Sequence, residues 1–235
     1  MFRWQVMKLR KPLTIAGLFF IILIVLGELL LPPVVESALE GRLSQKFSTP
    51  DVSVELTASP RLGLLLGHTD TLSVTVKDGQ VGQLRVREMS LNGRRADLDM
   101  SSFFKGKLAL EDAQELSLTA LFDENGLREA LARKISKADN VEVHITDDNV
   151  LVTADTNLLG RKAQVALVGH IVADDGTLYF DTEQFDIQNS PFGTARLGDT
   201  LGRIPLVKPE QLPLSMRVVS VSQQEGSVLV RAGEE

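Results

Sequence analysis

The apolar positions of this chain take three forms along its length. Residues 13–31 are almost all apolar, residues 34–47 place apolar side chains four apart, and from residue 51 apolar and polar positions alternate. These patterns are typical of a membrane-spanning helix, an amphipathic helix and half-buried strands respectively. The chain is therefore predicted to begin with a membrane span and to continue as an α+β domain.

The apolar run is long enough to cross a bilayer. At about 1.5 Å per residue it reaches roughly 28 Å, close to a hydrocarbon core of roughly 30 Å. Four Lys/Arg and no acidic residue precede it, and Glu28 is the only charge within it. The positive-inside rule then predicts that residues 1–12 form a cytoplasmic basic tail, that residues 13–31 form a signal anchor in the plasma membrane, and that residues 32–235 are extracytoplasmic.

A cleaved signal peptide shares the same basic and apolar pattern. No small-x-small cleavage pattern follows the run, and the run exceeds the usual apolar region of about 7–15 residues. A retained, single-pass anchor is therefore favoured, and cleavage stays open.

A second helix is expected directly after the span. Pro32 and Pro33 are expected to end the membrane helix and start a new one, because proline suits a first helical turn and breaks a helix interior. The apolar stripe of the new helix consists of Val35, Leu39 and Leu43. Such a stripe is either plain core or the wall of a ligand groove.

A third helix is predicted to start after Asp123, its expected N-cap residue. This start places Phe122 and Leu127 at the two positions of a hydrophobic staple. The apolar stripe of this helix is formed by Leu127, Leu131 and Ile135.

Alternation predicts many antiparallel strands and a long, bent sheet. Turns are expected at Asp78-Gly79, Asn92-Gly93 and Asp174-Asp175-Gly176. Between Val86 and Met89 the apolar parity slips by one residue, which predicts a β-bulge. Predicted strands include residues 52–57, 72–76, 84–91, 141–145, 150–154, 163–173, 178–185, 216–221 and 228–230.

One predicted strand, residues 163–173, is apolar on both faces. One parity holds Leu167 and Ile171, and the other holds Val168 and Val172. The strand either lies at the centre of a covered sheet or lines an internal apolar cavity.

Two loops combine apolar and cationic residues. Phe192 lies in the first, residues 189–193, and Ile204 and Leu206 lie in the second, residues 202–209. Proline and glycine in both stretches discourage regular strands. Such loops either enter a membrane interface or fold over the open end of the sheet and close its core.

Charge and composition exclude several functions. Residues 1–31 contribute +3 to the formal charge of −6, which leaves −9 on the remainder, so no nucleic-acid partner is expected. The chain has no cysteine, which excludes disulfides and a lipoprotein anchor. His68, His144 and His170 are isolated and lack metal-ligand spacing. We assign no catalytic residue, no metal and no cofactor.

Several spaced features resemble a known family. They are the residues 60–67 that read Pro-Arg-Leu-Gly-Leu-Leu-Leu-Gly, the alternating residues 72–91, the predicted hairpin of residues 163–185, and Leu212-Pro213 followed by residues 216–230. Together with the anchor and the helix of residues 34–47, they resemble the DUF2993 family, also called LmeA-like phospholipid-binding, over residues 34–232.

The resemblance implies a fold related to the tubular lipid-binding proteins. In that fold, long helices pack in the concave face of a strongly curved antiparallel sheet and leave a groove for acyl chains, so the expected fold is α+β with such a sheet. Members are described as phospholipid-binding envelope proteins, and a mycobacterial relative is linked to lipoglycan mannan elongation. The expected partners are membrane phospholipid and, through the N-terminal helix, the plasma membrane.

Three functions therefore stand as hypotheses. The first is a non-enzymatic phospholipid-binding or lipid-transfer protein, in which the helix stripes, the second face of the strand and the loops contact lipid. The second is an envelope assembly factor that binds a protein or glycan, and the third is an enzyme acting on a lipid-linked glycan. A continuous apolar tunnel would favour the first, a filled core the second, and converging carboxylates the third.

Overall fold

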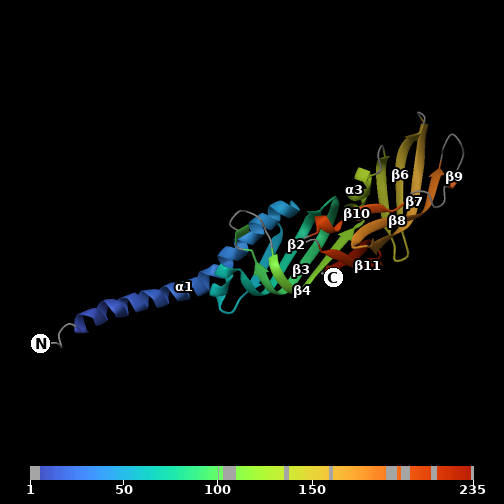
Figure 1. The fold of residues 1–235 in the computed structure, drawn as a ribbon. Helices are drawn as coiled ribbons and strands as arrows, with labels where there is room; N and C mark the ends of the chain where they lie inside the picture. The colour runs from blue at the N-terminus through green and yellow to red at the C-terminus, as the bar shows by residue number, and fades with distance from the viewer. Residues whose placement is uncertain are drawn as a thin grey trace.

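One long helix leads into two antiparallel sheets (Figure 1). The computed structural model describes residues 6–99, 101–102, 110–134, 138–158, 161–188, 195–196, 202–212 and 216–233. Helix α1 (Val6–Phe47) extends away from the sheets at its N-terminal end and lies against the first of them at its C-terminal end. The predicted α+β fold with a strongly curved antiparallel sheet is confirmed.

The first sheet, sheet A, is strongly curled. Its spatial order is β1-β2-β3-β4-β12-β11, so the last two strands of the chain return beside β4. Its strands are β1 (Val52–Thr57), β2 (His68–Val81), β3 (Leu84–Leu98), β4 (Leu110–Asp123), β11 (Arg217–Gln224) and β12 (Ser227–Gly233). The short helix η1 (Arg61–Leu66) connects β1 to β2.

The second sheet, sheet B, has the spatial order β10-β8-β7-β6-β5, and β9 pairs with β8. Helix α3 (Glu124–Lys134) connects sheet A to sheet B, and η2 (Pro209–Gln211) follows β10. The strands of sheet B are β5 (Ala138–Ile145), β6 (Val150–Leu158), β7 (Arg161–Asp174), β8 (Thr177–Gln188), β9 (Ala195–Arg196) and β10 (Ile204–Val207).

Helix α1 is continuous, so the expected break at Pro32 and Pro33 is wrong. The described chain holds one long helix instead of a span followed by several long helices. A proline inside a helix removes one N–H donor and leaves the carbonyl four residues earlier without its partner. For Pro32 that carbonyl belongs to Glu28, and Nη1 of Arg61 donates to it at 3.1 Å. A tertiary hydrogen bond thus replaces the lost helical one.

Two of the three expected turns are also wrong. Asp78-Gly79 lies within β2 and Asn92-Gly93 lies within β3, because these two strands form one long hairpin. The turn of that hairpin follows Val81 at Gly82, whose φ of 60° is left-handed. The third expected turn, around Asp175, does join β7 to β8.

The parity slip has a different cause from the expected bulge. The pairing register of β2 and β3 stays constant from His68↔Asp97 to Val81↔Leu84. Both strands change their buried parity opposite each other, next to Asp78, whose φ of 51° is left-handed. One face of the hairpin stays buried through the slip, because a Cβ at Gly79 would lie 2.7 Å from Val76 Cγ1 and 3.4 Å from Phe47 Cβ.

The start of α3 follows the sequence prediction. Asp123 accepts a hydrogen bond from Gly126 N at 3.0 Å, which confirms it as the N-cap residue. Phe122 and Leu127 are both fully buried. The N-cap depends only on residues close in sequence, which is why the pattern could predict it.

The two sheets share one hydrophobic core. Buried residues of α1, α3 and both sheets form a single cluster. Gly226 N at the β11–β12 turn donates to Ile145 O of β5 at 2.9 Å, and Gln223 Oε1 of β11 accepts from Ile171 N of β7 at 2.7 Å. These bonds join the edge of sheet A to sheet B.

Candidate functional site

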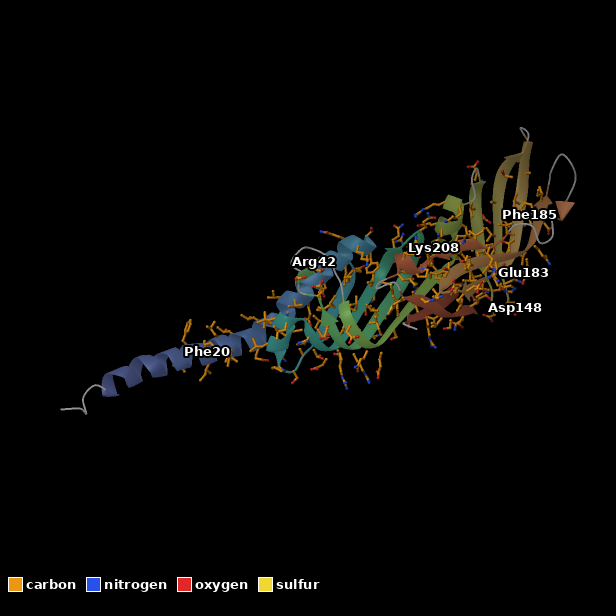
Figure 2. All side chains as sticks on the ribbon, viewed as in Figure 1. Phe20, Arg42, Asp148, Glu183, Phe185 and Lys208 are labelled. Carbon is orange, nitrogen blue, oxygen red and sulfur yellow. The ribbon has the colours of Figure 1, made fainter. Side chains whose placement is uncertain are left out.

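The N-terminal part of α1 carries exposed apolar side chains. From Leu18 to Leu30 the large side chains are between 40% and 66% exposed. The helix segment Leu18–Phe47 is long and apolar enough to cross a membrane, a property that a signal anchor and a signal sequence share. Figure 2 shows Phe20 on the part of α1 that extends beyond the sheets.

A clamp between α1 and η1 is formed by Gly27, Glu28, Arg61 and Leu62. The Glu28 carboxylate accepts hydrogen bonds from Arg61 N at 3.1 Å and from Leu62 N at 3.3 Å. Arg61 Nη1 donates to Glu28 O. A Cβ at Gly27 would lie 2.9 Å from Leu62 Cδ2, so glycine permits the close approach. This clamp, the α1–η1 clamp, holds the start of η1 beside the apolar run.

Two further carboxylates of α1 accept hydrogen bonds from the edge strand of sheet A. Glu40 accepts from Val54 N at 3.0 Å and Glu36 accepts from Leu56 N at 2.9 Å. These N–H groups lie on β1, an edge strand whose outer donors have no neighbouring strand. We call this contact between α1 and β1 the α1–β1 seam.

These glutamates and the η1 residues were not predicted as a site from the sequence. A signal was present, because Glu28 is the only charge in the apolar run and Glu36 and Glu40 follow at helical spacing. Spacing alone does not identify the backbone donors that the carboxylates reach. Those donors lie 14 to 34 residues further along the chain.

The predicted stripe of α1 faces the core beside this seam. Val35 and Leu39 are 7% and 2% exposed, and Leu43 is half-buried against the same cluster. On α3, Leu127 and Leu131 are fully buried, and Ile135 lies outside the described residues. The structure thus brings the α1 and α3 stripes into one core.

Residues Val168 and Val172 lie on the other face of β7 from the core. Leu167 and Ile171 are buried, whereas Val168 and Val172 are half-buried. β7 lies between β6 and β8, which makes it a central strand of sheet B. Val168 pairs with Leu151 of the neighbouring strand β6, so this face carries a small, partly exposed apolar surface.

The second predicted loop contains a strand. Ile204 begins β10 and is half-buried, and Leu206 is 3% exposed in the core. Pro205 is accommodated because β10 is the edge strand of sheet B. This stretch closes the core, and Phe192 of the first loop lies outside the described residues.

Arg203, directly before β10, links this strand to β7 and β8. It forms ion pairs with Asp174 and Asp181, and the pKa of Arg203 is raised above its ordinary value, chiefly by the charge of Asp181 and then by the hydrogen bond to Asp174. Directly after β3 of sheet A, hydrogen bonds from the side chain and backbone of Ser102 lower the pKa of Asp99 to about 2.

The described part of the core contains one small apolar cavity between the sheets among its pockets. This cavity has a volume of about 20 Å³, which is room for about one water molecule. This volume cannot hold an acyl chain. The lining is wholly apolar and comes from Val81, Leu84, Val86, Met89, Leu118, Ala120, Phe122, Leu178, Val207, Leu212, Val218 and Val230.

Two larger clefts are partly polar and open. One, of about 450 Å³, lies beside α3 and β5, and the other, of about 380 Å³, lies beside η1 and the end of sheet A. Within the described residues, no group of three or more His, Asp and Glu side chains is arranged to hold a metal ion.

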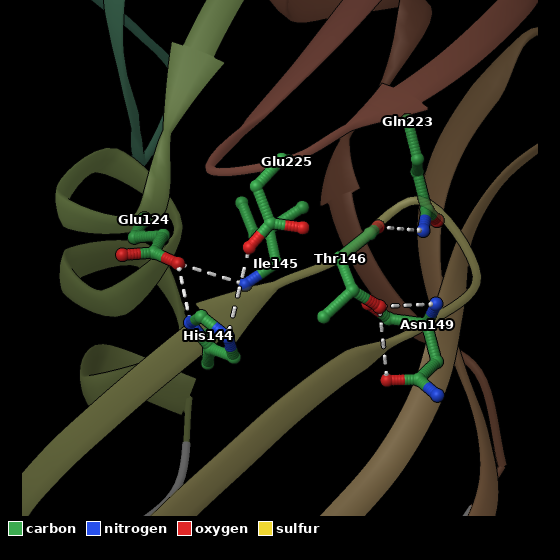
Figure 3. Close-up of polar contacts among 7 residues, drawn as sticks. All are labelled: Glu124, His144, Ile145, Thr146, Asn149, Gln223 and Glu225. Atoms are coloured by element: carbon green, nitrogen blue, oxygen red, sulfur yellow. Dashed lines mark hydrogen bonds and ion pairs between the residues drawn. The ribbon is translucent and has the colours of Figure 1, made fainter.

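The first of these clefts contains a polar cluster at the junction of the sheets (Figure 3). His144 Nδ1 lies 3.0 Å from Glu124 Oε1, which also accepts from Ile145 N at 2.9 Å. Glu225 approaches His144 Nε2 at 3.9 Å. Thr146 O accepts a bond from Gln223 at 3.5 Å. These contacts link α3, β5 and the β11–β12 hairpin.

The comparisons with known proteins identify a family. Residues 26–233 match the model of a family described as LmeA-like phospholipid-binding. The match begins next to the α1–η1 clamp and ends in β12, so it includes the seam and both sheets. Comparisons with curated proteins and with solved structures find no match.

Proposed function

The chain belongs to the LmeA-like phospholipid-binding family, and from this premise we propose that it is a membrane-anchored phospholipid-binding protein of the cell envelope. The N-terminal part of α1 spans the plasma membrane once, residues 1–12 are cytoplasmic, and residues 32–235 form an extracytoplasmic lipid-binding domain. The exposed apolar side chains of α1 and the basic residues before them support this orientation.

The observation that carries the proposal is the continuity of α1. The same helix bears exposed apolar side chains at its N-terminal end and the buried stripe of Val35, Leu39 and Leu43 further on. A lipid that leaves the bilayer along this helix would meet apolar side chains over the whole path. We therefore place the acyl chains between α1 and the face of sheet A that α1 covers.

The packing of α1 on sheet A sets a condition on this binding. Because Val35 and Leu39 of α1 are only 7% and 2% exposed, an acyl chain between α1 and sheet A requires the two to separate. Leu43 is the accessible member of the stripe, since it is only half-buried. The role of the protein in this proposal is binding or transfer of lipid without a catalytic step.

The close packing of α1 on sheet A also favours a second candidate function. An envelope assembly factor that binds a protein or a glycan through its acidic surface needs no internal cavity. Lipid in this case would contact the membrane helix alone.

Native mass spectrometry of the full chain, released from phospholipid nanodiscs, distinguishes the two functions. We expect phospholipid adducts on the wild-type chain and several-fold fewer on Leu43→Gln, because the substitution places an amide on the acyl path. The matched control is Val219→Gln, at a position 63% exposed on β11, which should keep the wild-type adducts. Equal adducts on all three chains would assign the lipid to the membrane helix and favour the assembly factor.

A further inference from the structure

Helix η1 exposes two large apolar side chains beside the membrane helix. Leu64 is 1% exposed and anchors η1 in the core, whereas Leu65 and Leu66 are 55% and 73% exposed. Apart from α1, only Leu151 and Val219 are comparably large, apolar and exposed among the described residues. Two adjacent exposed leucines need an explanation, because exposed apolar patches mark contacts with other molecules or with a membrane.

The α1–η1 clamp determines where these leucines lie along α1. The carboxylate of Glu28 accepts the backbone N–H groups of Arg61 and Leu62, at the start of η1. Figure 1 shows the teal segment that contains η1 at the end of the domain nearest the protruding part of α1. Leu65 and Leu66 therefore lie beside the end of the apolar run and far from sheet B.

The position of the α1–η1 clamp along α1 matches that of a bilayer interface. Glu28 lies three residues before the end of the run at Leu31, which corresponds to about 4.5 Å along a helix. At this depth, polar groups of the clamp reach the head-group region, while adjacent apolar side chains reach the acyl chains. Arg61 is exposed at the same level, and its charge is complementary to lipid phosphate.

We propose that Leu65 and Leu66 insert into the outer leaflet beside α1 and form a second membrane contact of the domain. The occupant of this apolar surface is the bilayer itself, because the surface continues the exposed apolar side chains of α1. The domain carries −9, so apolar insertion and not general charge attraction must hold it at the membrane. The inference rests on the proposed membrane anchoring of α1.

This contact has a consequence for lipid binding. A single helix leaves a domain free to tilt, whereas a helix and an inserted η1 fix its orientation. The α1–β1 seam follows the clamp along α1, so the fixed orientation holds the start of the proposed acyl path at the bilayer surface.

Site-specific fluorescence on the full chain tests the insertion. The chain has no cysteine, so Leu66→Cys can be labelled alone with a dye whose emission reports polarity. The labelled chain is reconstituted into vesicles of phosphatidylcholine and phosphatidylglycerol, and quenching is measured with nitroxide groups on the acyl chains and, separately, with iodide in the water. We expect blue-shifted emission and several-fold stronger quenching by the lipid nitroxide than for Val219→Cys, which is similarly exposed on β11.

A third labelled variant, Leu23→Cys, separates the inference from the proposed function. If the lipid nitroxide quenches Leu23→Cys but only the aqueous quencher reaches Leu66→Cys, the insertion of η1 is overturned. The anchoring of α1 still stands in that case. If Leu66→Cys is shielded from both quenchers, a protein surface such as a second copy covers it, which also overturns the insertion. If Leu23→Cys itself is not quenched by the lipid, the anchoring of α1 fails and the inference falls with it.

Discussion

Alanine at both Glu36 and Glu40 is expected to lower the free energy of unfolding by about 3 kcal/mol. Each carboxylate accepts one partly buried backbone N–H of the edge strand β1, and a hydrogen bond to a charged group contributes about 1.5–3 kcal/mol. We use the lower value for each because both side chains are half-exposed. Thermal unfolding of the full chain in detergent micelles measures the loss.

The same double variant should also loosen α1 from sheet A. Hydrogen exchange at the amides of Val54 and Leu56 should become faster, because their acceptors are gone. Glutamine at both positions keeps a neutral acceptor and should cost less, and Ser37→Ala on the exposed side of α1 should change little. Unchanged exchange at Val54 and Leu56 in the alanine variant would contradict the role of the seam.

Alanine at Gly169 is expected to destabilise the protein by about 3 kcal/mol. A Cβ at this position of β7 would lie 2.0 Å from the carbonyl oxygen of Asp181 in β8, and backbone cannot give way as a flexible side chain does. Overpacking of a tight site costs about 1–3 kcal/mol, and a clash with backbone lies at the upper end. The same unfolding measurement in micelles reports the change.

The matched control for this variant is Gly41→Ala. Gly41 lies in α1, and nothing lies within 4 Å of a Cβ built there. Alanine favours a helix interior over glycine by about 1 kcal/mol, so this variant should be more stable than the wild type. If alanine changed the free energy of unfolding by a similar amount at Gly41 and Gly169, the close contact at Gly169 would not be the cause of the destabilisation.

Local patterns predicted the elements of the fold well. Most strands of both sheets lie where the alternation of apolar residues indicated them, although β9 and β10 were not predicted, and Asp123 caps α3 as the spacing of Phe122 and Leu127 implied. These features depend on residues adjacent in sequence or in one strand. The same locality explains the errors, since Asp78-Gly79 and Asn92-Gly93 have turn propensity but lie within a long hairpin that overrides it.

The candidate site was predicted only in part. The stripe of Val35, Leu39 and Leu43 was recognised from its spacing, but spacing does not show how tightly such a stripe is packed. The loop of residues 202–209 has the composition of an interface loop, yet Leu206 covers the core because β10 pairs with β8. Pairing between distant segments cannot be recognised from a short stretch of sequence.

By itself, the sequence determined the apolar run, its preceding charges, the strand parities and the family resemblance, because each is a property of composition and spacing. Only the tertiary structure decided that α1 continues through Pro32, because Arg61 supplies the Glu28 carbonyl with a donor. It likewise decided that Glu36 and Glu40 cover the edge of β1. These bonds join residues far apart along the chain, so they exist only once helix and sheet have come together.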